Sequence, residues 1–128
     1  MLLIDTANVI GSRPTGWWRD RPGAARVFVE RVRATVAAGR LPEPVVVVVE
    51  GAARGGIDPG VGDGVTVLHA AGSGDDMLVG VIADSTSPVT LVSADRALRQ
   101  RARALGADLA RPGWLIDLLD DGDGPGAS

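Results

Sequence analysis

The sequence predicts a single α/β domain in which a mainly parallel sheet of four or five strands lies between two helical layers, a Rossmann-like three-layer sandwich. Short apolar runs alternate with helical patterns along the chain, as they do where helices connect parallel strands. One run is five consecutive valines, which indicates a strand buried on both faces. The length of 128 residues suits one domain with one core, and no internal repeat is visible.

The first third of the chain predicts two strands, a loop and a helix. Residues 2–5 (LLID) form a short apolar run that ends in an acid, as in a buried strand. Residues 8–21 are rich in turn formers and indicate a loop. Residues 22–38 predict a helix, because a proline suits its first turn, apolar residues recur every four positions and a glycine follows. The valines at 45–49 form the second strand.

The rest of the chain continues the alternation, with glycines or polar residues between the elements. The expected elements, in order, are a glycine-rich loop at 52–64, a strand at 65–69, a helix at 74–84, a strand at 89–92, a helix at 96–105, a short strand at 107–110 and a helix at 112–119. The domain therefore spans residues 1–119. Residues 120–128 (DDGDGPGAS) predict a disordered, acidic, glycine-rich tail.

The composition excludes several classes of protein. There is no cysteine, so disulfides and thiolate metal sites are absent, and there is no lysine. A phosphate-binding P-loop needs a lysine, as do phosphoaspartate receivers and haloacid-dehalogenase-like phosphatases. No apolar stretch is long enough to cross a membrane and no signal peptide is visible, so we expect a cytoplasmic protein without a membrane partner. The net charge is −3, and the tail holds three of the 16 acids.

Acidic residues follow the predicted strands at the points where they end. Asp5, Glu50 and Asp95 each lie at or just after a strand, and Asp75 and Asp76 open the helix after the third strand. Ligands of open α/β sheets bind at this edge. Two bare carboxylates about 4 Å apart repel by about 4 kcal/mol at an effective dielectric near 20, so such a cluster favours bound cations.

The donor set predicts the kind of metal. With no cysteine and one histidine, nearly all ligands are oxygens, which favours Mg²⁺ or Mn²⁺ over Zn²⁺. We expect the five acids named above to form the metal site, with the second of the adjacent pair either a ligand or an outer partner. Such ions could activate a water and bind a phosphoryl oxygen.

Each acid also has a purely structural interpretation. Asp5 fits a turn that bonds nearby backbone amides, and Asn8 fits a turn residue. Ser73 and Asp76 have the spacing of a capping box, and Asp95 fits the N-cap of the next helix. These alternatives stay open at the level of the sequence.

An arginine- and tryptophan-rich segment, RPTGWWRDR, occupies residues 13–21. Aromatic side chains can stack on the bases of single-stranded RNA while arginines bind its phosphates. The expected RNA-binding residues are Arg13, Trp17, Trp18, Arg19, Arg21 and, beside the fourth strand end, Arg96. The alternatives are that the tryptophans pack on the first helix and that the arginine face of residues 96–103 is solvated.

Four motifs in order, LLIDTANVIG, VVVVVEG, GSGDD and LVSAD, resemble those of the NYN branch of the PIN-like ribonuclease superfamily, especially its YacP-like group. The resemblance spans residues 2–117. It implies a PIN-like fold with strand order 3-2-1-4-5 and metal-dependent cleavage of RNA. By this resemblance Asp5, Asp75 and Asp95 hold metal and Asn8 is the catalytic asparagine. Glu50 stands where YacP-like chains often have an aspartate.

The expected function is therefore an Mg²⁺- or Mn²⁺-dependent ribonuclease acting on single-stranded or structured RNA. A second hypothesis is a non-catalytic RNA-binding or toxin–antitoxin-type interaction module with a vestigial metal site. A third is a structural α/β domain in which the acids only cap helices. A homodimer is compatible with the sequence, which does not fix the oligomeric state.

Overall fold

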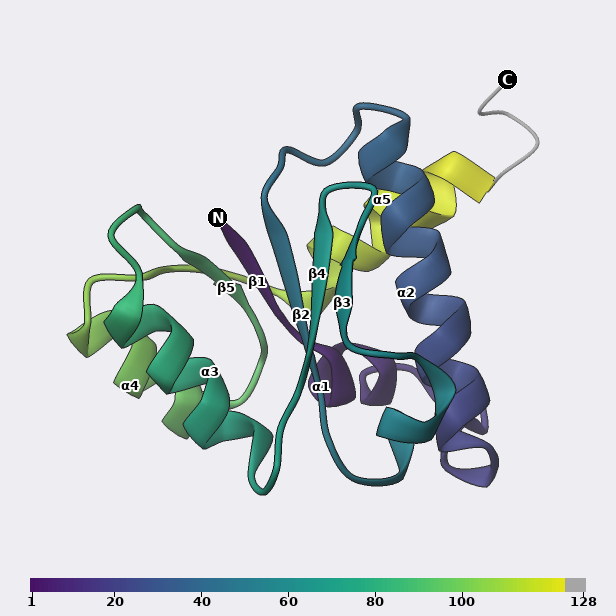
Figure 1. The fold of residues 1–128 in the computed structure, drawn as a ribbon, viewed down its shortest axis with the longest axis horizontal. Coiled ribbons are helices and arrows are strands. Elements are labelled where there is room, and N and C mark those ends of the chain that lie inside the picture. Colours follow the sequence, from purple (N-terminus) through teal and green to yellow (C-terminus); the bar gives the residue numbers. More distant parts are fainter. Residues whose placement is uncertain (124–128) are drawn as a thin grey trace.

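The structure is a computed structural model that describes residues 1–123. Its strands are β1 (Leu2–Asp5), β2 (Val45–Val49), β3 (Gly60–Gly62), β4 (Val65–His69), β5 (Thr90–Val92) and β6 (Asp108–Ala110). They form one sheet in the order β3-β4-β2-β1-β5-β6, and helices cover both faces (Figure 1). The predicted α/β class is confirmed, and the five predicted strands lie in the predicted order.

The five predicted strands are parallel, and their pattern of side chains explains the two helical layers. All five valines of β2 are buried, and successive valines alternate between the two faces of the sheet. Val45, Val47 and Val49 belong to the hydrophobic cluster on one face, whereas Val46 and Val48 belong to the cluster on the other. A run without polar residues thus marks the strand at the centre of the sandwich.

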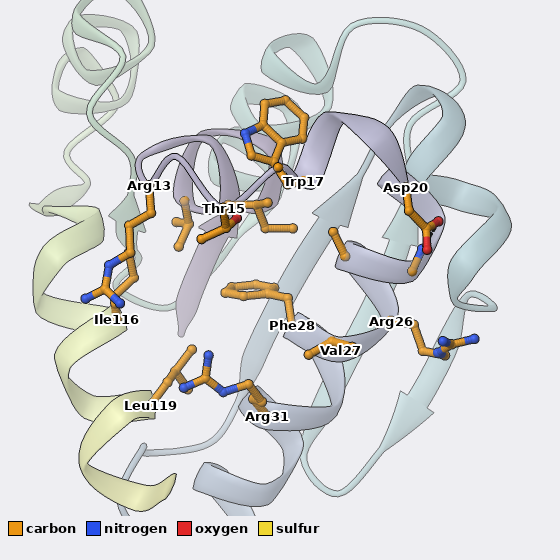
Figure 2. Close-up of a pocket in the computed structure, with 15 residues that line it drawn as sticks. Arg13, Thr15, Trp17, Asp20, Arg26, Val27, Phe28, Arg31, Ile116 and Leu119 are labelled. Carbon is orange, nitrogen blue, oxygen red and sulfur yellow. Dashed lines mark hydrogen bonds between the residues drawn. The ribbon is translucent and has the colours of Figure 1, made fainter. Parts of the chain in front are cut away.

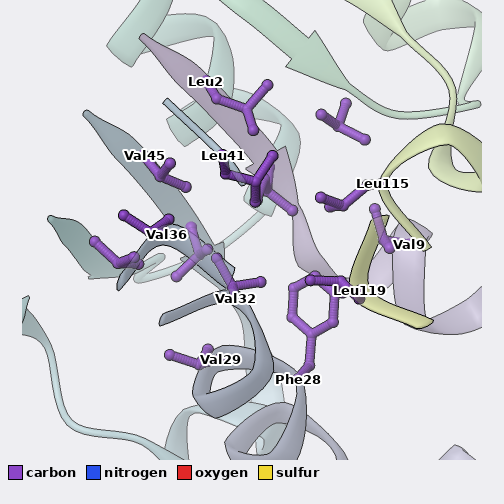
Figure 3. Close-up of a cluster of buried hydrophobic side chains, with 14 of the residues drawn as sticks. Leu2, Val9, Phe28, Val29, Val32, Val36, Leu41, Val45, Leu115 and Leu119 are labelled. Carbon is purple, nitrogen blue, oxygen red and sulfur yellow. The ribbon is translucent and has the colours of Figure 1, made fainter. Parts of the chain in front are cut away.

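One face of the sheet packs against α1 (Thr6–Gly11), α2 (Arg21–Ala37) and α5 (Pro112–Asp123). Figure 3 shows the side chains of this cluster meeting between the helices and the strands. Phe28 of α2, the only phenylalanine in the chain, joins Val9 of α1 and Leu119 of α5 in it. The other face packs against α3 (Gly74–Asp84) and α4 (Arg96–Ala104), through residues that include Leu78 and Leu98.

The structure differs from the sequence prediction in the glycine-rich segment before β4. The sheet has six strands rather than four or five, because β3 forms there and pairs antiparallel with β4. Val61 of β3 lies opposite Thr66 and is 77% exposed. Two glycines and one exposed valine give neither an apolar run nor an alternation, so hydrophobic periodicity cannot find such an edge strand.

The loop predicted at residues 8–21 is also partly helical. Helix α1 begins at Thr6, directly after β1, and a 3₁₀ turn, η1 (Trp17–Arg19), precedes α2. A second 3₁₀ segment, η2 (Gly51–Gly56), follows β2. Six residues are too few for helical periodicity to stand out, and α1 forms where Asp5 caps it.

Helix α5 extends beyond its predicted end. It runs to Asp123, so residues 120–123 lie in the helix and the boundary predicted after residue 119 is too early. The remainder of the predicted tail, 124–128, lies outside the described residues. Within residues 1–123, none of the helices has the length and apolar character needed to cross a membrane.

Candidate functional site

The acids predicted from the sequence lie around the carboxyl ends of the parallel strands. Asp5 ends β1, Glu50 follows β2, and Asp95 follows β5, while Asp75 lies in the first turn of α3. The chain leaves β1 toward β2 on one side, and β5 lies on the other side, so the strand order reverses beside β1. Ligands of α/β sheets bind at such a reversal. We call Asp5, Glu50, Asp75 and Asp95 the acid edge.

Asp5 is 7% exposed and is held by both neighbouring segments. Its Oδ1 accepts a hydrogen bond from the backbone N–H of Asn8 at 3.4 Å, and its Oδ2 accepts one from the hydroxyl of Ser93 at 2.9 Å. The Oδ1 of Asn8 in turn accepts from the backbone N–H of Ala94 at 2.8 Å. These bonds join the end of β1 to the end of β5 across the reversal.

Two other acids use one carboxylate oxygen to cap a helix. The Oδ1 of Asp95 accepts from the backbone N–H of Leu98 at 2.9 Å, at the start of α4. The Oε2 of Glu50 accepts from the backbone N–H of Gly74 at 2.7 Å, at the start of α3. A Cβ on Gly74 would be 2.9 Å from the Glu50 carboxylate, which would have to shift to make room for it. Each acid keeps its second oxygen for another partner.

Burial and the charges of neighbouring acids raise the pKa of two of these carboxyl groups. Desolvation raises the pKa of Asp5 from 3.8 to about 6, against the lowering effect of its hydrogen bonds, and the charges of Asp75 and Glu50 add to the rise. The pKa of Asp75 is also raised, first by desolvation and then by Asp95 and Glu50, while Arg101 opposes the rise. The carboxylates of Asp5 and Asp75 therefore lie within electrostatic reach of other acids of the edge.

Asp76 adds its charge to those that raise the pKa of Asp75, but it has an arginine partner of its own. Its Oδ1 is 3.3 Å from two guanidinium nitrogens of Arg101 in α4, and its side chain is 76% exposed. The capping box predicted for Ser73 and Asp76 is wrong, because Ser73 makes no side-chain capping bond and Glu50 bonds the first amide of the helix instead. The two aspartates in the first turn of α3 thus have different neighbours: Asp75 belongs to the acid edge, and Asp76 pairs with Arg101 of α4.

The donor atoms at the acid edge suit a hard cation, because all are carboxylate oxygens. Within residues 1–123, however, the aspartate, glutamate and histidine side chains form no group of three placed to hold a metal ion. The predicted set of five ligands is therefore not assembled as a coordination shell.

The arginine- and tryptophan-rich segment forms the loop before α2. Trp18 is 51% exposed, with the Arg19 guanidinium 5.9 Å from its ring centre. Trp17 is half-buried, and the Arg21 guanidinium lies 5.2 Å from its ring centre. A Cβ on Gly11 of α1 would be 3.4 Å from the Trp17 ring, so Trp17 packs on α1. The packing alternative named the helix at 22–38, whereas this contact is with α1, a helix that the sequence did not predict. Trp18 is exposed to solvent.

Arg13 has a partner far along the chain. Asp120 of α5 accepts hydrogen bonds at 2.8 Å from both Arg13 and Arg31, and we call these three residues the Asp120 clip. Figure 2 shows both arginines beside Ile116 and Leu119 of α5, at one side of a cavity of about 440 Å³. Arg96, by contrast, is exposed next to Asp95.

Sequence reasoning missed residues whose roles depend on tertiary contacts. Ser93 is fully buried and bridges two site acids, because its hydroxyl donates to Asp5 and accepts from the backbone N–H of Asp95 at 3.1 Å. Thr6, next to Asp5, is buried, and its hydroxyl has no hydrogen-bond partner in the described part of the chain. Both lie in quoted motifs, LLIDTANVIG and LVSAD, and a polar residue beside a strand-end acid was the only available signal.

Comparison with known proteins supports the fold. The sequence matches no family model, and no curated protein is significantly similar to it. Among solved structures, Rae1 (YacP) from Bacillus subtilis, in its W164L mutant, superposes with a TM-score of 0.70. The match covers 93% of this chain and 73% of that one, with 16% sequence identity. The chain therefore has the PIN-like fold of Rae1 (YacP), as the resemblance of its four motifs to YacP-like chains implied.

Proposed function

We propose that this chain is a metal-dependent ribonuclease that hydrolyses RNA phosphodiester bonds at the acid edge with Mg²⁺ or Mn²⁺. The observation that carries the proposal is the gathering of four carboxylates at one edge of the sheet, where burial and neighbouring acids raise the pKa of Asp5 and of Asp75. A cation stabilises carboxylates that lie near other negative charges, and phosphate oxygens bind such a cation. The PIN-like fold adds support, because the motif resemblance is to ribonucleases of this fold.

Asp5, Glu50, Asp75 and Asp95 would hold the metal. When bound, Mg²⁺ or Mn²⁺ would supply an activated water and neutralise phosphate charge. Because no three acids are grouped as ligands in the part of the chain described here, binding would draw their side chains together. Asp76 is excluded from our proposed set, since it pairs with Arg101.

The chain's own residues would orient the RNA. Asn8 uses its Oδ1 on Ala94, so its side-chain N–H groups are the donors left for a phosphate oxygen or the attacking water. Trp18, Arg19 and Arg96 are exposed, and in this proposal they bind single-stranded or structured RNA. Base–aromatic stacking contributes about 1–3 kcal/mol per base.

A second candidate is a non-catalytic RNA-binding or toxin–antitoxin-type interaction module with a vestigial metal site. Two observations favour it: Asp5 and Asp95 both serve as helix caps, and within residues 1–123 no three acids are arranged as metal ligands. This candidate predicts RNA binding without cleavage. The third hypothesis, a structural domain whose acids only cap helices, predicts neither RNA binding nor RNA cleavage.

The Asp95→Asn variant separates these candidates. Asparagine keeps an Oδ1 for the amide of Leu98 but loses the charge that would hold metal. We expect wild type to cleave single-stranded RNA in Mn²⁺ and the variant to lose activity on the order of 100-fold, while its circular dichroism and melting temperature stay near those of wild type.

The matched control is Asp20→Asn. Asp20 also caps a helix, through the backbone N–H of Gly23 at 3.0 Å, but lies outside the acid edge. We expect it to retain cleavage. A wild type that binds RNA without cutting it would favour the vestigial module, and a protein that does neither would favour the structural domain.

A further inference from the structure

A second cavity, of about 330 Å³, adjoins the acid edge. Thr6 and Ile10 of α1, Trp17 and Arg21 before and at the start of α2, and Glu50 after β2 are among its lining residues. Glu50 belongs to both the cavity and the acid edge. A ligand in the cavity would therefore lie next to the proposed site of cleavage.

One residue that lines the cavity, Thr6, has a buried hydroxyl that makes no hydrogen bond within residues 1–123. Thr6 is 1% exposed, and its Oγ1 has no hydrogen-bond partner among the described residues. Leaving a buried polar group unpaired destabilises a fold, and nearly all such groups in proteins have a partner. This hydroxyl can donate one hydrogen bond and accept others, so it suits a ligand with polar atoms at its edge.

The opposite wall suits a flat, aromatic ligand that carries negative charge. Trp17 lines the cavity, and the Arg21 guanidinium lies 5.2 Å from the centre of its ring. An indole can contact the face or edge of a base, and an exposed guanidinium can bind a phosphate. Further lining residues, Ala24, Val49 and Ala53, are apolar and favour burial of a ring over that of a hydrated ion.

The walls of the cavity are fixed by close packing. Segment η2, which supplies Gly51 and Ala53, lies against the start of α2. A side chain on Gly56 would overlap the backbone of Pro22, so the two segments approach as closely as their main chains permit. Ile10, Trp17 and Ala24 also line the cavity of Figure 2, and thus form the boundary between the two cavities.

We propose that this cavity is a pocket for one unpaired nucleobase of the RNA strand, with its ribose. The Thr6 hydroxyl bonds a polar atom of the nucleoside, Trp17 contacts the base, and Arg21 binds the adjoining phosphate. The strand then passes Glu50 to reach the acid edge. The volume is at the lower end of ligand sites, about 300–1,000 Å³, which suits one nucleoside. This pocket deepens the proposed ribonuclease function and rests on it for the identity of the ligand as RNA.

The test uses the four nucleoside 5′-monophosphates as probes, without divalent metal. Binding is followed by the indole N–H signals of the three tryptophans in NMR spectra, at probe concentrations up to about 10 mM, the range for weak ligands. We expect saturable shifts at Trp17 for at least one nucleotide. Trp114 lies on α5 and lines neither cavity, so its signal should stay in place.

Two variants address the pocket itself. Thr6→Val keeps the shape but removes the hydroxyl, and should weaken nucleotide binding about 2- to 10-fold without lowering the melting temperature, because no hydrogen bond within the protein is lost. Ala53→Leu fills the cavity and should weaken binding at least as much. Thr15→Val and Val27→Leu are the matched controls, since both residues line only the other cavity, and both should bind as wild type does.

The outcomes separate the pocket from the ribonuclease. A protein that cleaves RNA in Mn²⁺ but shows no nucleotide binding, or binding equal in wild type, Thr6→Val and Ala53→Leu, overturns the pocket and leaves the proposed function intact. Nucleotide binding that both variants weaken, in a protein that cleaves no RNA, supports the pocket as a nucleotide site and overturns the ribonuclease.

Discussion

Asp5 at the acid edge and Asp120 in the Asp120 clip are aspartates that each accept two hydrogen bonds, yet their pKa values shift in opposite directions. Asp5 is buried, accepts from an amide and a hydroxyl, and its pKa is raised to about 6. Asp120 accepts from Arg31 and Arg13, which lower its pKa. The chain thus neutralises the acid of the clip with its own arginines, whereas Asp5 accepts from a neutral amide and a neutral hydroxyl.

Removing the charge of Asp5 should have the largest effect on stability. A folded-state pKa above the ordinary value means that the folded protein binds the proton more tightly, so stability falls as the pH rises from 3.8 through about 6. The full difference corresponds to about 3 kcal/mol above that range. In EDTA, Asp5→Asn should therefore raise the free energy of unfolding at pH 7.5 by up to about this amount, and by much less near pH 4.

Urea denaturation at several pH values measures this effect. Asparagine can still accept from the amide of Asn8, and its side-chain N–H can bond the Ser93 hydroxyl oxygen, so the packing is conserved. A variant that is destabilised equally at both pH values would show that the hydrogen bonds of Asp5, and not its charge, dominate its contribution.

Binding of a cation at the acid edge should offset the repulsion between its carboxylates and raise the stability of the folded protein. A ligand that binds only the folded state stabilises it by about 1.4 kcal/mol at ten times its dissociation constant. We expect millimolar Mn²⁺ to raise the melting temperature of wild type, and Asp75→Asn to lose most of this rise. Asp120→Asn should keep it, because its carboxylate is occupied by arginines. Equal rises in wild type and Asp75→Asn would remove Asp75 from the ligand set.

The Asp120 clip should show the smallest effect, with the opposite pH dependence. A lowered folded-state pKa gives stability that is present above 3.8 and is lost as the pH falls through the folded-state value. Asp120→Asn should lower the free energy of unfolding by less than about 1 kcal/mol at pH 7, because the pairs are partly exposed.

Thermal melts at pH 7 and pH 3 measure this difference in stability, which should be smaller at the lower pH. Asp121→Asn is the control: its pair with Arg40 is longer, 3.9 Å, and its side chain is 74% exposed. An Asp120→Asn variant no weaker than Asp121→Asn at pH 7 would mean that the clip adds nothing to stability.

The sequence predicted the elements that are dominated by burial. The valines of β2 could be recognised because a strand buried on both faces has no polar position. The bounds of α3 were predicted to the residue, Gly74–Asp84, because a glycine turn and an apolar stripe define them. By contrast, β3 and α1 are stabilised by neighbours, the β4 backbone and the Asp5 cap, which no local pattern reveals.

The candidate site could be predicted in part, because its acids lie at the ends of strands that the sequence does predict. Asp5, Glu50 and Asp95 could be predicted as site residues because each lies at or after a strand end, and parallel strands place their carboxyl ends at one edge of the sheet. Which neighbour each acid bonds depends on tertiary contacts. Asp76 and Arg101, which pair between two helices, are 25 residues apart in the sequence, and Ser93 and Asp5 are 88 residues apart. Metal and RNA binding by these residues remain predictions.

The hydrogen bonds across β1 and β5 also constrain when the site forms during synthesis. Asn8 and Ala94 are 86 residues apart, and Asp5 and Ser93 are 88 apart. Contacts of such sequence separation form late in folding, since a long loop must close first. On the ribosome, Asp5 emerges early but stays without its hydroxyl partner until the LVSAD segment has left the exit tunnel. A nascent chain therefore completes its acid edge only after residues 91–95 have emerged.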